Sequence, residues 1–541
     1  MNRRGSDAAF LLPVLVFVAL FAIVPVAFLF GRSLDAAGGA AGFGAILTSP
    51  SNVRAVDNSL VQGGLSALAA VALGYPAGVF VGRYQWPGRS VLRAFLLVPF
   101  LLPSLVVVFG VLDLFGTSGL LSTALPALGV FGSGLPAIVV ANLMFNVPIV
   151  VLFTAAGCEG SSADLEETVA TLGGTPARAY RDVWGAPTGV GAIAGGLLTF
   201  LFSSLSFAPP LLLCGPGCYT IEAQVWFLDT FGLQPAAAGV LSLAMVAIFL
   251  LPTGAYLLVV GRLRANSGRR RATLRRVDRR SPVALALATE TALVVVGVLV
   301  LLGSVLVRTV TPVGGGSAGS AWSLLFSAAT TQKLGISAVG ALGNTLFFAS
   351  VAAGIAIVLG IVTGYAIARR PRRAGALGLV LFVPLLISPV VLAFSLAQFW
   401  RPLLGGESTV WALIIVSQAS LALPLALQSL EIPLSGLSPA ERDAARTLGA
   451  TGWVAFLDAD LPRVRDGLVT AGMFAFALGL GEFTATYFLA TPTFTTLPVA
   501  LYDLSATRYV PAVSDAAAGL LLLLSLAVFG VLVYGGRRVE L

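Results

Sequence analysis

The sequence predicts an all-α integral membrane protein with about twelve transmembrane helices, and three observations support this fold class. Of the 541 residues, 57% are hydrophobic and only 10% are charged, whereas a soluble domain carries roughly 25% charged residues. Apolar windows long enough to cross a bilayer recur along the whole chain. Arginine residues concentrate in alternate loops, as the positive-inside rule requires of a multi-pass protein.

The apolar windows give the predicted helices in order. They lie at 9–31, 57–82, 92–116, 135–157, 189–213, 236–260, 284–307, 341–368, 375–399, 408–430, 467–490 and 514–535. The first window is too long for a signal peptide and lacks a small-residue cleavage site, so we expect it to be retained. With the N-terminus in the cytoplasm, 26 of the 32 basic residues fall on the cytoplasmic side. This bias predicts that both termini are cytoplasmic.

Composition excludes several chemical roles. The chain has no histidine, and its single lysine, Lys333, follows Gln332, so the Gly-Lys-Ser/Thr phosphate loop of an ATPase is absent. Three cysteines are too few for a disulfide scaffold or a four-ligand zinc site. We therefore expect no catalytic residue, metal site or cofactor, and any ATP hydrolysis must occur in a partner chain. The net charge of +8 is explained by topology, so no nucleic-acid partner is expected.

Cys214 and Cys218 lie near the predicted outer face, where the compartment is oxidising. The segment between them is Gly-Pro-Gly. The sequence leaves a small disulfide open, but it favours unpaired thiols.

The chain contains an internal repeat. At an offset of 276 residues, Asn142 falls on Gln418, Gly173 on Gly449 and Phe207 on Phe483. Near an offset of 286, 58–60 (Asn-Ser-Leu) match 344–346 (Asn-Thr-Leu). We predict two parallel six-helix halves, 1–262 and 284–541, joined by an arginine-rich cytoplasmic linker at 263–283 that acts as a passive basic loop.

Two classes of transporter use this plan: fused permeases of ATP-driven importers and secondary transporters of the major-facilitator type. The cytoplasmic segments at about 159–188 and 431–465 discriminate between them, because an ordinary joint has about 2–8 residues. Each is predicted to form two short helices around a left-handed glycine, Gly173 or Gly449. Thr175 and Thr451 are predicted to cap the second helix. In the second segment, Ser438 and Glu441 are predicted to form a capping box.

These segments resemble the "EAA" coupling loop of the permease subunits of binding-protein-dependent ABC importers. The second segment fits the pattern closely, and the first fits less well because Pro187 lies one residue late. The resemblance implies a type I-like permease fold in the plasma membrane, a pair of ATPase subunits that use ATP-Mg, and an extracytoplasmic substrate-binding protein. The residues that would couple to the ATPase subunits are Glu167, Gly173, Asp443, Ala444, Ala445, Gly449, Leu461 and Pro462.

Other stretches resemble thiamine permeases and the related ferric-iron permeases. They are 102–112, 141–148 and 206–222 in the first half, and 481–487 and 496–498 in the second. The resemblance implies transport of thiamine or a phosphorylated thiamine, with ferric iron as the alternative. A proton-coupled transporter is less favoured, because few titratable groups lie within the predicted helices, among them Asp113, Glu290 and Glu482.

Four residues are candidates for the substrate pathway. Glu482 lies in a predicted helix, and a carboxylate at that depth faces either a hydrogen-bonding neighbour or a pathway for a cationic substrate. Phe207, Trp226 and Tyr487 would stack on a flat cationic ring. Packing between helices is the alternative role for these three aromatic residues.

Overall fold

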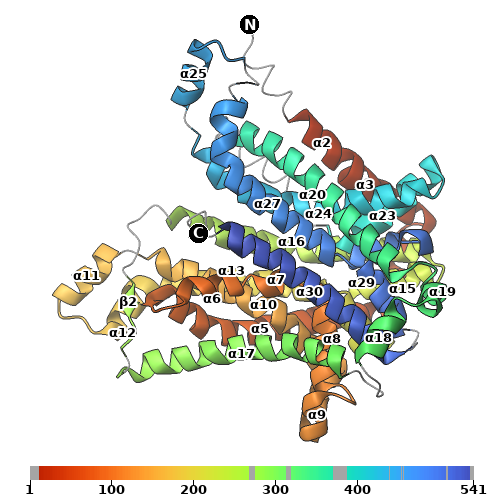
Figure 1. Cartoon of the computed structure of the whole chain (residues 1–541), viewed down its shortest axis with the longest axis horizontal. Coiled ribbons are helices and arrows are strands. Elements are labelled where there is room, and N and C mark those ends of the chain that lie inside the picture. Colours follow the sequence, from red (N-terminus) through yellow and green to blue (C-terminus); the bar gives the residue numbers. More distant parts are fainter. Residues whose placement is uncertain are drawn as a thin grey trace. The chain divides into compact units, whose positions relative to one another are not determined.

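The computed structural model describes residues 11–161, 163–266, 274–278, 280–311, 318–368, 387–437, 439–451, 454, 456–506 and 510–536. Helices make up almost all of them (Figure 1). The chain divides into two compact units. Unit 1 contains Met1–Ala36, Leu101–Pro103 and Gly319–Leu541, and unit 2 contains Ala37–Phe100 and Ser104–Ala318.

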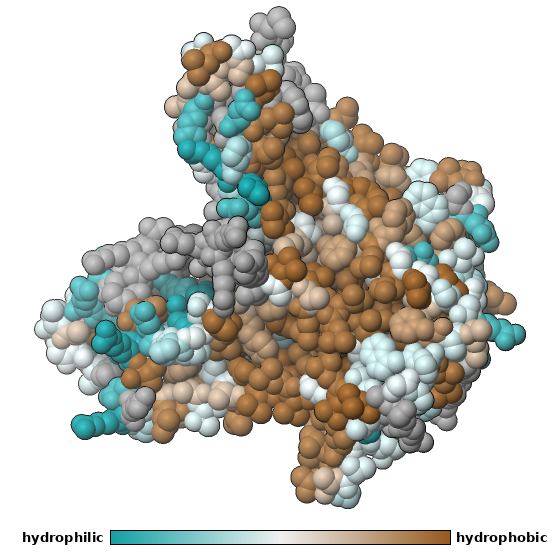
Figure 2. All heavy atoms as spheres, viewed as in Figure 1, coloured by the Kyte–Doolittle hydropathy of each residue, from teal (hydrophilic) through white to brown (hydrophobic). Residues whose placement is uncertain are grey.

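The predicted all-α membrane fold is confirmed. Within the described part of the chain, eleven helices are long and apolar enough to cross a bilayer. The predicted window 375–399 contributes the shorter helix Pro389–Leu404, and its residues 375–386 lie outside the described residues. Figure 2 shows hydrophobic residues over the spanning helices and hydrophilic residues gathered around α25 and around α11, α12 and β2.

Unit 2 is built around the helices α5, α10 and α13, which pack on one another. Gly74, Gly78 and Gly82 recur at every fourth position of α5, and a Cβ at Gly78 would lie 2.4 Å from Cβ of Thr154 on α10. Small residues at this spacing let two membrane helices approach closely. The elements of unit 2 are α4 (Ala40–Leu47), α5 (Pro50–Arg83), β1 (Tyr84–Gln85), α6 (Arg89–Phe95), α7 (Val98–Leu101), α8 (Ser104–Phe115), α9 (Leu120–Ala124), η2 (Pro126–Gly132), α10 (Gly134–Glu159), α11 (Ala163–Thr171), α12 (Pro176–Ala179), η3 (Tyr180–Trp184), α13 (Gly185–Ser204), α14 (Ala208–Leu213), η4 (Gly215–Cys218), α15 (Ile221–Thr230), α16 (Pro235–Asn266), β2 (Arg275–Arg276) and α17 (Pro282–Val310).

Unit 1 has an equivalent centre, formed by α20, α24 and α27. Alanine dominates the packed surface, as at Ala356, Ala422 and Ala471. The elements of unit 1 are α2 (Leu12–Val18), η1 (Ala19–Ile23), α3 (Val24–Ala36), α18 (Ala318–Leu325), α19 (Ala328–Leu334), α20 (Ala338–Ala368), α23 (Pro389–Leu404), α24 (Ser408–Ser435), α25 (Pro439–Thr447), η6 (Phe456–Asp460), α27 (Leu461–Gly481), α28 (Thr484–Leu489), η7 (Pro492–Phe494), α29 (Leu497–Ala506) and α30 (Pro511–Gly536).

Each unit takes the first helix of the other predicted half. In unit 1, the segment Leu12–Ala36 packs on α23, where the indole N–H of Trp400 donates to the carbonyl of Leu20 at 3.3 Å. In unit 2, α17 packs on α5 and α8, with Arg308 within 4.0 Å of Asp113. Apart from the short segment Leu101–Pro103, which belongs to unit 1, the compact units therefore differ by one exchanged helix each from the predicted sequence halves.

The same hydrogen bonds recur at the positions that the repeat relates. Asn58 donates to the carbonyl of Tyr219 at 3.2 Å, and Asn344 donates to the carbonyl of Thr495 at 3.0 Å. The next residue in each half accepts a backbone N–H, from Ile221 to Ser59 at 2.9 Å and from Leu497 to Thr345 at 2.8 Å. These pairs support the predicted repeat, although the arrangement of the two halves in the membrane stays a prediction.

Three predicted helices are broken in the structure. The window 92–116 is interrupted between α7 and α8 at Pro103, which has no N–H for a continuous helix. The windows 189–213 and 467–490 end early, at Ser204 and Gly481, and short helices follow them. The predicted continuous helices were wrong at these places. Near the break after Ser204, the Ser203 carbonyl accepts from the Gln62 side chain at 2.7 Å. After Gly481, the Glu482 carboxylate accepts from backbone N–H groups of α28.

The linker between the predicted halves carries regular structure. Its residues Arg275–Arg276 form strand β2, which pairs in parallel with β1, Tyr84–Gln85, directly after the C-terminal end of α5. The described part of the linker is thus attached to unit 2, which differs from the predicted passive loop.

Candidate functional site

Both predicted coupling loops contain the expected glycine turn. Gly173 has φ of +74° and Gly449 has φ of +91°, so the predicted left-handed conformation is confirmed at both. Each turn is closed by the same hydrogen bond, from Gly174 N–H to the Val169 carbonyl at 2.8 Å and from Ala450 N–H to the Ala445 carbonyl at 3.1 Å. This pairing is the Schellman pattern for ending a helix.

The predicted threonine caps are also present. The hydroxyl of Thr175 accepts from the N–H of Arg178, and that of Thr451 from the N–H of Val454, both at 3.4 Å. The predicted capping box stays a prediction. Ser438 lies outside the described residues, and the carboxylate of Glu441 accepts a hydrogen bond from Arg463.

In the first loop, the buried acid is Glu166 rather than its predicted neighbour. Glu166 pairs with Arg83 at 2.5 Å and with Arg275, whereas Glu167 is exposed. Burial alone would raise the pKa of the Glu166 carboxyl, but the two guanidinium groups outweigh it and hold the pKa below its usual range. The sequence feature that could have pointed to Glu166 is Arg83, which directly follows the predicted helix 57–82.

The second loop presents its predicted residues differently. Asp443, Ala444 and Gly449 are exposed, and Ala445 is partly buried. Leu461 and Pro462 begin α27. Asp460 and Phe456 are among the residues of the loop that contact its own unit. Asp460 is buried and accepts a hydrogen bond from the Tyr365 hydroxyl at 3.3 Å, and the ring of Phe456 meets that of Tyr365 at 5.8 Å. The role of these residues in coupling stays a prediction.

Among the large apolar residues that the structure describes, the most exposed one of each loop was not a predicted coupling residue. Leu172 is 80% exposed and Leu448 is 89% exposed, each directly before the left-handed glycine. The two leucines correspond at the offset of 276, so the repeat itself was the signal that could have identified them.

Glu482, the predicted pathway carboxylate, caps a helix of unit 1. It is buried directly after α27, and its Oε1 accepts from the N–H of Ala485 at 2.7 Å. Its Oε2 accepts from the N–H and the hydroxyl of Thr486, at 2.8 and 2.5 Å. The carboxylate therefore satisfies backbone donors at the start of α28, and its place in a pathway stays a prediction.

The candidate aromatic residues lie in two separate groups, one in each unit. In unit 2, the rings of Phe207 and Trp226 meet edge to face with centroids 6.0 Å apart. In unit 1, Tyr487 stacks on Phe483 at 5.1 Å and meets Tyr502 edge to face at 4.7 Å. Tyr502 was missed, although it corresponds to Trp226 at the offset of 276.

Cys214 and Cys218 form a disulfide, with Cα atoms 5.6 Å apart. The expectation that these thiols are unpaired was wrong, because the turn η4 between them returns the chain on itself. The third cysteine, Cys158, is buried and free. Within the described residues, no group of three or more histidine, cysteine, aspartate or glutamate side chains could hold a metal ion.

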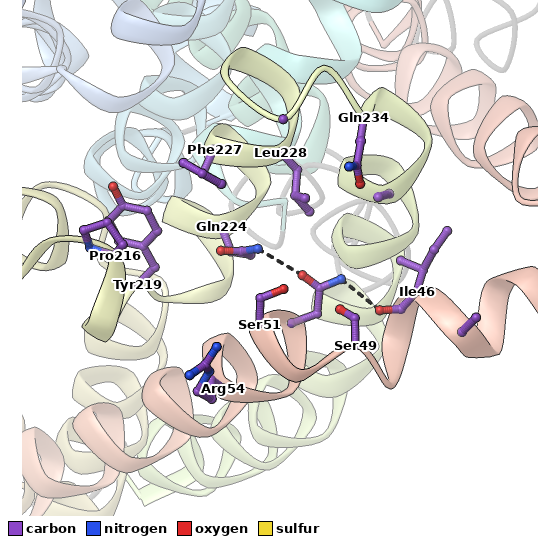
Figure 3. Close-up of a pocket in the computed structure, with 14 residues that line it drawn as sticks. Ile46, Ser49, Ser51, Arg54, Pro216, Tyr219, Gln224, Phe227, Leu228 and Gln234 are labelled. Carbon is purple, nitrogen blue, oxygen red and sulfur yellow. Dashed lines mark hydrogen bonds between the residues drawn. The ribbon is translucent and has the colours of Figure 1, made fainter.

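Unit 2 also contains a pocket of about 580 Å³ between α4, the start of α5, and α15 and α16 (Figure 3). Gln224 donates to Asn52 Oδ1 at 3.1 Å, and Asn52 donates to the Ile46 carbonyl at 2.8 Å. Arg54 and Tyr219 also line the pocket. These segments belong to predicted outer loops.

The chain is similar to several transport proteins, although no protein-family model matches it. It is 26% identical over 459 residues to the thiamine transport system permease protein ThiP of Escherichia coli strain K12, covering 82% of each chain. It is 25% identical over 519 residues to ThiP of Salmonella typhimurium, covering 93% of this chain and 92% of that one. It is 29% identical over 212 residues to the molybdenum transport system permease protein ModB of Mycobacterium tuberculosis, covering 38% of this chain and 79% of that one.

Proposed function

We propose that this chain, which resembles the thiamine permeases of ABC importers over most of its length, carries thiamine across the plasma membrane. Its apolar helices and its similarity to transport permeases make it a multi-pass membrane permease of the ABC importer type. Our proposal goes further in three respects: the substrate, the partner subunits and the cytoplasmic position of both termini.

The observation that carries the proposal is the extent of the similarity. The two thiamine permeases match 82% and 93% of this chain, and they are themselves matched over 82% and 92% of their length. The match over 93% of the chain leaves out too few residues to omit either coupling loop. The molybdenum permease matches only 38% of the chain.

The proposed mechanism requires no chemistry in this chain. Two ATPase subunits, which would hold ATP-Mg, bind the loops around Gly173 and Gly449 from the cytoplasm. ATP binding closes the ATPase pair and displaces both coupling loops, which opens the pathway outward. Hydrolysis then resets it. Rigid helix–turn–helix loops suit this task because their glycine turns and threonine caps define the angle between the two short helices.

The substrate side of the proposal rests on aromatic rings. Thiamine contains two aromatic rings and a fixed positive charge, which a tyrosine or tryptophan face attracts. Trp226 with Phe207 in unit 2, and Tyr502 with Phe483 in unit 1, supply such faces at related positions, and Tyr487 lies beside Tyr502. A substrate-binding protein would deliver the ligand from outside, and the pocket lined by Arg54 and Gln224 lies on segments that this topology places there.

Molybdate is the second candidate substrate, because the molybdenum permease has the higher identity, 29%, over the stretch that it covers. An oxyanion would not be attracted by aromatic faces, so the two candidates predict different effects of aromatic substitutions. Ferric iron, the alternative implied by the sequence resemblance, is a metal cargo and needs no stacking surface either.

The test is uptake of labelled thiamine, molybdate and ferric iron by cells that contain or lack this chain. We expect loss of thiamine uptake alone when the chain is absent, and recovery on its return. Loss of molybdate or iron uptake alone would show that thiamine is not the substrate, but it would still support the permease function. A chain carrying Tyr502→Phe and one carrying Tyr502→Ala serve as a matched pair, because only the second removes the aromatic face.

A further inference from the structure

One buried side chain in unit 2 contacts both ends of the first coupling loop. Arg83 is the last residue of α5 and is 3% exposed. Its Nη2 donates to Oε1 of Glu166 on α11 at 2.5 Å. Its guanidinium carbon also lies 4.6 Å from the ring centroid of Trp184, at the end of η3. The loop's first and last helical segments are therefore held by the same residue.

The linker between the predicted halves joins this contact. Strand β2 pairs with β1, which directly follows Arg83, and Arg275 of β2 donates to the same Oε1 of Glu166. Successive residues of a strand point to opposite faces. Accordingly Arg276, the next residue, lines a separate groove of about 1010 Å³ beside α17 and has no ion pair with a described residue.

The charges explain why this contact persists. Glu166 is buried, and an unpaired carboxylate there would be costly, so its ion pair with buried Arg83 must stay formed. Arg275 is half exposed, so its own pair with Glu166 is weaker and screened by salt. Arg275 therefore adds a second, adjustable support to a contact that Arg83 already makes.

The second coupling loop lacks this arrangement in its sequence. The residue that corresponds to Glu166 at the offset of 276 is Arg442, which cannot accept an ion pair from arginine. Contacts of that loop include Glu441 with Arg463 and Tyr365 with Asp460. The Glu166 contact of the first loop therefore has no counterpart at the related position of the second.

We infer that a brace, formed by the ion pairs of Glu166 with Arg83 and Arg275, makes the first coupling loop move together with α5. The linker contributes Arg275 to this brace and so helps to position the loop. Arg275 is a positioning residue: it contacts no substrate and acts through Glu166. This inference rests on the proposed importer function for its consequence in transport. Its structural part, the support of α11 by Arg275, is independent of that function.

The structural part is tested by hydrogen exchange of the full chain in detergent. In Arg275→Ala we expect the amides of α11 to exchange about two- to fivefold faster, the effect of losing one half-exposed ion pair. The amides of α25 should be unchanged. Arg276→Ala is the matched control, because it removes a neighbouring arginine of the same strand that does not contact Glu166. If the α11 amides exchanged equally fast in both variants, the proposal that Arg275 supports α11 would be wrong.

The functional part is tested with the complete complex in proteoliposomes, measuring labelled thiamine taken up per ATP hydrolysed. We expect Arg275→Ala to lower this ratio several-fold and Arg275→Lys to restore most of it. Glu166→Gln should lower the ratio further than Arg275→Ala, because it also leaves buried Arg83 without its carboxylate. The double variant should be no worse than Glu166→Gln alone. An unchanged ratio in Arg275→Ala would refute the positioning role. If the unmodified complex fails to transport thiamine, the proposed substrate is wrong. The hydrogen-exchange experiment would still show whether Arg275 supports α11.

Discussion

Gly449 shows how one residue sets the shape of a coupling loop. It follows α25 with φ of +91°, and nothing lies within 4 Å of the position that its Cβ would occupy. A substitution there is therefore limited by backbone strain and not by space. The left-handed conformation costs an ordinary residue about 1–2 kcal/mol, and a β-branched side chain more.

We expect Gly449→Val to abolish uptake while the chain remains in the membrane at its normal amount. Valine would force the turn out of its left-handed conformation and so change the direction of the segment that follows. Gly449→Asn is the control, because asparagine tolerates this conformation. Uptake and membrane content are measured together, and normal uptake by Gly449→Val would remove the coupling role of this turn.

Glu482 shows a carboxylate used by the backbone at membrane depth. It accepts three hydrogen bonds at the start of α28. Capping by a negative charge is favourable there because the first N–H groups of a helix lack intrahelical partners.

We expect Glu482→Gln to destabilise the purified chain by about 1–3 kcal/mol, the cost of leaving a buried donor without its acceptor. Thermal unfolding in detergent measures this effect. Uptake should fall in proportion to the folded fraction, with an unchanged KM for thiamine. A raised KM at normal stability would instead support the predicted pathway role of this carboxylate.

At the scale of elements, each coupling loop combines a rigid turn with an exposed leucine. Leu172 and Leu448 are 80% and 89% exposed, while the polar residues around them make local contacts. A leucine with this exposure at the tip of a repeated loop, which the sequence predicts to be cytoplasmic, is suited to enter an apolar pocket of another subunit.

We expect Leu448→Asp and Leu172→Asp each to weaken binding of the ATPase subunits about tenfold or more, the value of one fully buried leucine. Co-purification with those subunits and their titration onto the detergent-solubilised chain measure it. Leu125→Asp is the control: Leu125 is 59% exposed and belongs to a predicted outer loop. Equal binding by all three variants would place the docking contact elsewhere on the loops.

At the scale of the whole molecule, the exchanged first helices make each unit depend on both sequence halves. α17 covers α5 and α8 in unit 2, where Leu301 lies so close that a Cβ on Gly110 would be 2.5 Å from its Cδ2. Contact of this closeness stabilises helices in lipid through packing, since lipid itself is as apolar as leucine.

We expect a fragment of residues 37–318 to be more stable than a fragment of residues 1–262, although the second is one complete predicted half. The first keeps α17 on its packing surface, and the second exposes that surface and carries an unpartnered first helix. Monodispersity and thermal unfolding in detergent compare them. Greater stability of 1–262 would contradict the packing seen for α17.

Much of the fold could be predicted from local patterns in the amino-acid sequence. A spanning helix satisfies its own backbone hydrogen bonds, so length, apolarity and flanking arginines are sufficient to recognise it. The glycine turns of both coupling loops were equally accessible, because Gly173 and Gly449 stand between capping residues within a few positions. The repeat offset also relates Tyr502, Leu172 and Leu448 to counterparts in the other half, so the amino-acid sequence contains the signal for them.

Contacts between residues far apart in the sequence could not be predicted from local patterns. Glu166 meets Arg83 across 83 positions and Arg275 across 109, and no periodicity or spacing relates them. The same is true of the helix exchange and of the breaks after Ser204 and Gly481. The amino-acid pattern determines which segments enter the membrane because that choice depends on each segment's own solvation. Which helix covers which, and which arginine meets the buried glutamate, depends on packing between surfaces that only the folded chain brings together.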